Sequence, residues 1–214
     1  MNEISIQERY SPAGYALPRF VIDGKHLYDY ITDWLSDRPG LLNSISPVDD
    51  LEIAWTDEYD FEGDARFMRF ILQQDSAITP ILSCPDDFDF SCIVIVADVI
   101  KLKNTVLWKR IGKVDHSEEV FEEEKRSGIL YTAAYTAEDW KQFGNNIAKE
   151  SVDSQAWCEW ISENWCEELF RRRVNYTFPY YQDETHIEWF AECNFEFDRA
   201  EYEAVVEKCY SYDL

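Results

Sequence analysis

The most regular pattern of apolar and polar positions lies in the middle of the chain. Residues 92–97 (CIVIVA) form a continuous run rich in β-branched side chains, which indicates a strand buried on both faces. The run passes into an alternation of apolar residues with lysines, and after Asn104 a second stretch of this kind extends to Val114. These two stretches predict a long hairpin over about residues 92–114.

Other segments follow either a helical or a strand period. Apolar residues recur three and four positions apart in segments that predict helices over 27–35, 63–74, 154–173 and 199–210, with shorter helices over 117–124 and from Thr136. Alternation predicts strands over 3–9, 51–55 and 186–197, and the apolar stretch 20–22 runs into a turn signal at Asp23-Gly24. Because the elements are interspersed without a regular strand–helix–strand series, the pattern favours an α+β fold. We expect a mainly antiparallel sheet with several packing helices.

The length and composition are those of one folded unit. No linker rich in Gly, Pro or Ser divides the 214 residues, so we predict a single domain over residues 1–214. The chain is 46% hydrophobic and 16% aromatic, which is more apolar material than a disordered acidic segment carries.

Charge adds the main functional clue. There are 43 Asp and Glu against 20 Lys and Arg, a formal net charge of −23. A surface of this kind repels nucleic acid and anionic lipid and attracts basic proteins. We therefore predict a basic protein partner and no binding to nucleic acid or membranes, and we leave the oligomeric state open.

The N-terminus and the cysteines indicate a cytoplasmic protein. The first nine residues lack the basic and apolar regions of a signal peptide, and the longest apolar run is too short to span a bilayer. Six cysteines are therefore expected to be reduced thiols rather than a disulfide framework.

No motif predicts catalysis, a cofactor or a metal ion. The three histidines have no ligand spacing with each other or with cysteine, and no phosphate-binding glycine loop occurs. Residues 58–64 fit the start of an EF-hand loop, but Arg69 stands where a bidentate Glu is needed. Among 43 acids some pair always looks like a catalytic dyad, so a hydrolase or transferase of unrecognised type stays as an alternative.

Acidic residues interleaved with aromatic residues are the candidates for partner binding. Carboxylates would attract Lys and Arg, and aromatic side chains would anchor the contact. The candidates come from three segments: Trp55, Asp57, Glu58, Tyr59, Asp60 and Glu62; Asp87 and Asp89; and Glu188, Phe190, Glu192 and Glu196. For each segment the other interpretation is an ordinary solvated surface.

Basic residues gather in two places. The hairpin carries Lys101, Lys103, Lys109, Arg110 and Lys113, which we expect to neutralise neighbouring acidic elements or to protect a strand edge. Arg171–Arg173 stand where the long helix predicted over 154–173 should end, which suits the negative end of its dipole.

In composition, and in stretches such as LPRFVIDG (17–24) and WKRIG (108–112), the chain resembles the immunity proteins of bacterial polymorphic toxin and contact-dependent inhibition systems. Such proteins are compact, acidic and rich in Trp and Tyr, and they neutralise a cognate toxin domain that is frequently a basic nuclease. The resemblance implies a non-enzymatic inhibitor that acts by stoichiometric binding. A phage or plasmid DNA mimic that inhibits a defence enzyme, or an adaptor subunit, are the alternatives.

Overall fold

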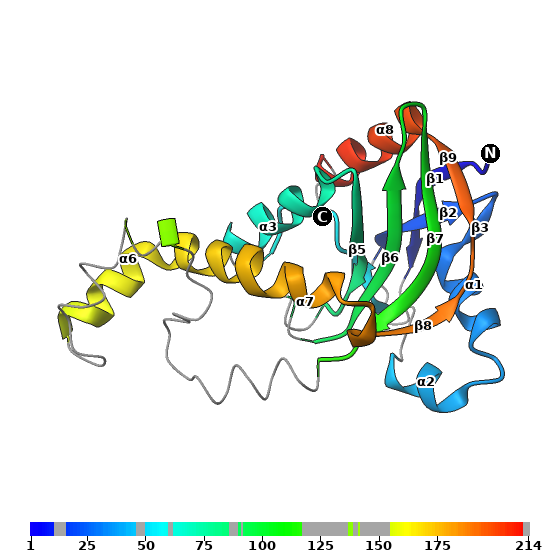
Figure 1. Ribbon diagram of the computed structural model, residues 1–214. Coiled ribbons are helices and arrows are strands. Elements are labelled where there is room, and N and C mark those ends of the chain that lie inside the picture. The colour runs from blue at the N-terminus through cyan, green and yellow to red at the C-terminus, as the bar shows by residue number, and fades with distance from the viewer. Residues whose placement is uncertain are drawn as a thin grey trace.

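The structure is a computed structural model that describes residues 1–10, 16–45, 50–59, 62–85, 90, 92–116, 137–138, 141 and 155–211 (Figure 1). Its strands are β1 (Ile4–Tyr10), β2 (Ala16–Ile22), β3 (Lys25–His26), β4 (Glu52–Ile53), β5 (Ser76–Ser83), β6 (Val94–Lys101), β7 (Thr105–Val114), β8 (Ile187–Ala191) and β9 (Phe195–Asp198). Its main helices are α1 (Leu27–Trp34), α2 (Pro39–Ser44), α3 (Glu62–Leu72), α6 (Gln155–Arg172), α7 (Phe178–Gln182) and α8 (Arg199–Tyr210).

The strands form two antiparallel sheets. A small sheet has the order β1-β2-β3, and a six-stranded sheet has the order β4-β5-β6-β7-β8, with β9 also paired to β7. The predicted α+β class is therefore confirmed, and so is the central hairpin, in which β6 and β7 pair from Ile95↔Lys113 to Lys101↔Val106. Figure 1 shows this hairpin at the centre of the large sheet, with α7 beside the lower end of β5.

Strand β5 was not predicted, and its Pro80 explains why. A proline inside an apolar run normally argues against a strand, because it has no N–H to donate to a neighbour. Here Pro80 lies at an irregularity in the pairing with β6, where the register shifts between Pro80 and Leu82. The side chain of Gln182 bonds both the N–H and the C=O of Ile78, at 2.8 and 3.1 Å, and so satisfies part of the edge of β5.

The single strand predicted over 186–197 is divided into two strands, β8 and β9, in the structure. β8 and β9 both pair with β7, but residues 192–194 separate them, and Asn194 has the left-handed φ of 51°. Asn is one of the few residues that adopts this conformation readily. The alternation predicted over 186–197 therefore does not continue through the segment.

The core between the two sheets is aromatic. Trp55 lies 4.7 Å from Phe20, 5.9 Å from Trp108 and 5.4 Å from Tyr202, measured between ring centroids. Phe197 completes the group against Trp108 at 5.4 Å. All five side chains are fully buried, so much of the aromatic content counted in the sequence stabilises the core.

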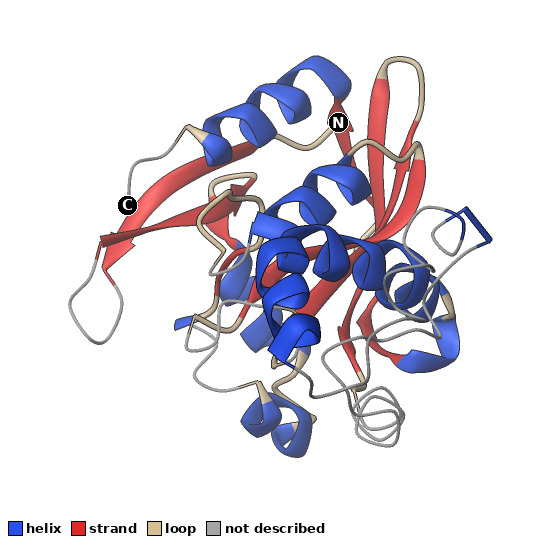
Figure 2. Ribbon diagram, turned by 90° about the vertical axis from the view of Figure 1, so that its left-hand side faces the viewer, coloured by secondary structure: helices blue, strands red, loops and turns tan. Residues whose placement is uncertain are grey.

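Helices α3 and α6 pack side by side, and Figure 2 shows them in front of the strands. Gly63 makes this approach close, because a Cβ there would lie only 2.9 Å from the carbonyl oxygen of Cys166 and from Cβ of Leu169. α6 ends at Arg172, as predicted, but the helical path continues through a π-helix, Arg173–Thr177, into α7.

The remaining predictions divide into those confirmed and those that fall outside the described residues. Helices α1, α3 and α8 occur where expected, whereas α2, which begins at Pro39, was not predicted. The helices predicted over 117–124 and from Thr136 lie largely outside the described ranges. No helix in the described part of the chain is long and apolar enough to cross a membrane.

Candidate functional site

The aromatic residues of the first candidate segment belong to the core, which corrects their predicted role. Trp55 is 0% exposed and its indole N–H donates to the carbonyl of Pro80 at 2.9 Å. Tyr59 is 6% exposed and its hydroxyl donates to the carbonyl of Ala54 at 2.7 Å. Because each buries its ring and satisfies its polar atom internally, neither is available to a partner.

The carboxylates of this segment differ from one another. Asp57 is exposed, but Arg69 from α3 holds both of its oxygens, with the Nε–Oδ1 bond at 2.8 Å. Glu58 and Glu62 are exposed and make no ion pair with a described cation. Asp60, Asp87 and Asp89 lie outside the described residues.

A β-bulge corrects the prediction for Phe190. Ile111 pairs with Ala191 and Gly112 pairs with Trp189, so Phe190 is the extra residue between the two pairs. The bulge changes the alternation of faces, and Phe190, which was expected beside Glu188 on the exposed face, is instead buried. Glu188, Glu192 and Glu196 are exposed, as predicted.

These three glutamates lie along one edge of the large sheet, where the N-terminus adds two more carboxylates. The N–H of Asn2 donates to the carbonyl of Glu196 at 2.5 Å, and its side-chain oxygen accepts from the N–H of Glu196 at 2.8 Å. The amide nitrogen of Asn2 donates in turn to Asp23 at 2.6 Å. We call the resulting group the acidic edge: Glu3, Asp23, Glu188, Glu192 and Glu196.

Half-buried aromatic rings border the acidic edge. Tyr30 and Trp34 of α1 pack against Phe195 of β9, with ring centroids 5.4 and 6.2 Å away. Both rings are partly exposed, and Figure 1 shows α1 beside the β8–β9 edge. Neither ring was a candidate in the sequence analysis: Trp34 fell on the expected apolar face of the helix over 27–35, and Tyr30 was not singled out. The pattern gave no sign that this face extends beyond the core.

No carboxylate of the acidic edge forms an ion pair with a described cation. Lys113 lies opposite Glu188 in the sheet, but its Nζ bonds the hydroxyl of Ser44 at 3.2 Å. Arg38 contacts the carbonyl of Trp189 at 3.5 Å. Hydrogen bonds from the Asn2 side chain and the Glu3 N–H lower the pKa of Asp23, so its negative charge persists.

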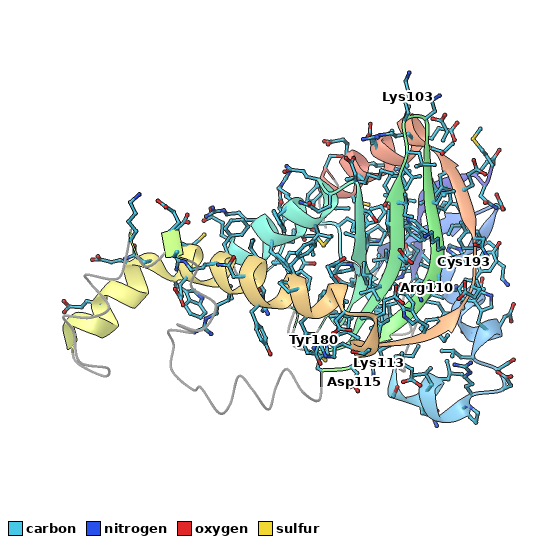
Figure 3. All side chains as sticks on the ribbon, viewed as in Figure 1. Lys103, Arg110, Lys113, Asp115, Tyr180 and Cys193 are labelled. Atoms are coloured by element: carbon cyan, nitrogen blue, oxygen red, sulfur yellow. The ribbon has the colours of Figure 1, made fainter. Side chains whose placement is uncertain are left out.

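Most of the described cations are paired with other carboxylates. These pairs are Arg9–Asp29, Lys25–Asp33, Arg66–Glu167, Arg69–Asp57, Lys141–Glu138 and Arg199–Glu203. In the central hairpin Arg110 pairs with Asp98 at 3.1 Å and with Glu184, which confirms its predicted neutralising role. Figure 3 shows Arg110 and Lys113 on the sheet, with Lys103 pointing away from the hairpin tip. The excess negative charge therefore remains on exposed carboxylates.

The arginine triplet serves a purpose that the helix-dipole argument did not predict. Glu168 of α6 is completely buried and pairs with Arg171 at 2.6 Å and Arg172 at 3.5 Å. Arg173 pairs with Asp64, also completely buried, at 2.7 Å, across the contact between α3 and the π-helix. We call these five residues the buried ionic cluster. Its Arg173–Asp64 pair connects the π-helix that follows α6 to α3.

The cysteine thiols and the possible metal ligands are the other groups that could support chemistry. Cys84, Cys166, Cys193 and Cys209 form no disulfide. Burial raises the pKa of Cys193 to about 11 and that of Cys209 to about 12, so both are neutral thiols. Within the described ranges no three His, Cys, Asp or Glu residues are grouped so that they could hold a metal ion.

Comparison with known proteins gives no match: no family model, no curated protein and no solved structure is significantly similar to the chain. The functional argument therefore rests on the surfaces described above.

Proposed function

We propose that this protein is a non-enzymatic inhibitor that binds a basic protein domain stoichiometrically through its acidic edge, in the manner of a bacterial immunity protein. The observation that carries the proposal is the set of five exposed carboxylates that form no ion pair with a described cation and lie beside half-buried aromatic rings. A basic nuclease toxin is the partner class that best suits it.

The arrangement supports both fast association and slow dissociation. The exposed carboxylates of the acidic edge produce a negative field that attracts a cationic surface. Their oxygens can also accept hydrogen bonds from Lys and Arg of a partner. Trp34 and Tyr30 supply partly exposed aromatic area, and Trp and Tyr are enriched among residues that contribute most to binding energy. The steering carboxylates and the anchoring rings thus lie on neighbouring elements.

The test first looks beside this gene for a secreted protein with a basic C-terminal domain and uses that domain as the probe; its absence would count against the proposal. We expect E192K/E196K to slow association at least tenfold at low salt, because it reverses two of the steering charges. E58K/E163K is the matched control, since Glu58 and Glu163 are also exposed glutamates that make no ion pair within the described ranges, and the net charge changes equally. Stopped-flow kinetics over a range of salt concentrations would measure both variants.

Two results would contradict the proposal. Association that does not depend on ionic strength would exclude the electrostatic mechanism, because exposed charges are screened by salt. Equal slowing by E58K/E163K would show that the acidic edge is not the contact surface. Protection of cells that produce the basic domain, lost in E192K/E196K and kept in the control, would connect binding with inhibition.

A further inference from the structure

A cavity of about 280 Å³ lies between the end of α3, the β6–β7 hairpin and α8. Three cations line it: Arg69, Lys101 and Arg199. Its remaining wall includes the apolar side chains of Leu72 and Val206. Three cations around one cavity contrast with the net charge of −23 and suggest a ligand of opposite sign.

Existing contacts hold each cation in place. The guanidinium of Arg69 is fixed by Asp57 and lies 4.1 Å above the ring of Tyr210. Arg199 bonds Glu203 at 2.7 Å and donates to the carbonyl of Leu102 at 2.9 Å. These contacts orient the groups before any ligand arrives, which lowers the entropic cost of binding.

Lys101 is the central group. Its Nζ donates to the carbonyl of Leu72 and so caps the C-terminus of α3, but an ammonium has three N–H donors, and Lys101 pairs with no carboxylate in the described part of the chain. Burial, followed by the positive charge of Arg199, lowers the pKa of Lys101. A positive charge is thus held where an anion would stabilise it.

We propose that this cavity binds a small organic anion, a phosphate ester or a carboxylate, with its charged group on Lys101 and Arg199 and its apolar part against Leu72 and Val206. The cavity is far larger than the roughly 30 Å³ of one water in the liquid, so the ligand has an organic part. Glu203 and Glu207 also line the cavity, and Arg199 already holds Glu203.

The test titrates the full chain with phenyl phosphate and with benzoate at constant ionic strength, by calorimetry and thermal denaturation. We expect saturable one-site binding of at least one of them, with a Kd in the millimolar range or below, and K101Q should weaken it at least tenfold. The tighter of the two anions identifies the source as a phosphate ester or a carboxylate. K109Q, which removes an exposed lysine from β7, is the matched control and should change the Kd less than twofold.

A second variant separates binding from folding, because K101Q also removes a helix cap. Gln73 is exposed and lines the cavity, so Q73W should fill it and abolish binding while all three cations remain. The absence of saturable binding by either anion would overturn the proposal, and so would an equal loss in K109Q. The proposal is independent of the acidic edge, and E192K/E196K should leave anion binding unchanged.

Discussion

The protein uses carboxylates in two opposite ways. In the buried ionic cluster, Glu168 and Asp64 have no exposed side-chain surface, and three arginines surround them. At the acidic edge, Glu188, Glu192 and Glu196 are exposed and have no ion-pair partner among the described residues. The carboxylates of the buried ionic cluster are thus paired and buried, whereas those of the acidic edge are exposed and form no ion pair with a described cation.

The difference shows that net charge alone does not identify a binding surface. A buried carboxylate must be compensated, because removing it from water costs several kcal/mol. An exposed carboxylate has no such requirement and remains free to act on a partner. The buried ionic cluster therefore stabilises the fold, whereas the acidic edge is available to bind a partner.

The largest effect should come from breaking the buried ionic cluster. E168Q leaves Arg171 and Arg172 without their carboxylate, and we expect the free energy of unfolding to fall by about 3–5 kcal/mol. The neighbouring E167Q is the matched control, because Glu167 pairs with Arg66 at the surface, where a pair contributes about 0–1 kcal/mol. Urea denaturation of the two variants would measure the difference, and equal losses would contradict the contrast between buried and exposed pairs.

A middle-sized effect should come from Cys193, which lies next to Glu192 of the acidic edge in the chain. Its thiol follows Glu192 in the chain but points inward and donates to the carbonyl of Trp108 at 3.2 Å. Burial raises its pKa from 9.0 to about 11, so the folded protein keeps a proton that the unfolded chain loses. Stability should therefore fall as the pH rises from 9 to 11, by roughly 2 kcal/mol from this group.

The variant C193S isolates that contribution. A serine hydroxyl can still donate to Trp108 but does not titrate in this range. Unfolding by urea at pH 8.5 and pH 11 should show a steeper loss in the natural chain than in C193S. Equal losses of stability in the two proteins would mean that solvent reaches the thiol of Cys193 and that burial does not hold its proton.

The same two regions show what sequence reasoning could predict. The central hairpin and the long helices follow from periodicity, because burial of a continuous run or a helical stripe needs no knowledge of distant residues. The role of Trp55 could not be predicted, since the sequence shows that acids surround it but not that β5 and α8 enclose it. The partners of the arginine triplet were hidden for the same reason, because Arg173 and Asp64 lie 109 positions apart.

Some features of the acidic edge could likewise be predicted from the sequence, and others could not. Exposure of Glu188, Glu192 and Glu196 was predictable from strand alternation, but the bulge at Phe190 was not, because one extra residue changes the faces without changing the composition. The contribution of Glu3 and Asp23 depends on Asn2, whose contacts join the first and last parts of the chain. Only the folded structure brings these five carboxylates to one edge.

The smallest effect on folding should come from the acidic edge itself. E192K removes an exposed charge that has no ion-pair partner in the described structure, so we expect the free energy of unfolding to change by no more than about 0.5 kcal/mol. Its sign should be stabilising at low salt, because the substitution reduces the self-repulsion of a chain with a net charge of −23. The gain should disappear at about 1 M salt, where the screening length is roughly 3 Å. A loss above about 1 kcal/mol would instead show that Glu192 is needed for folding, and the acidic edge could no longer be set apart from the buried ionic cluster.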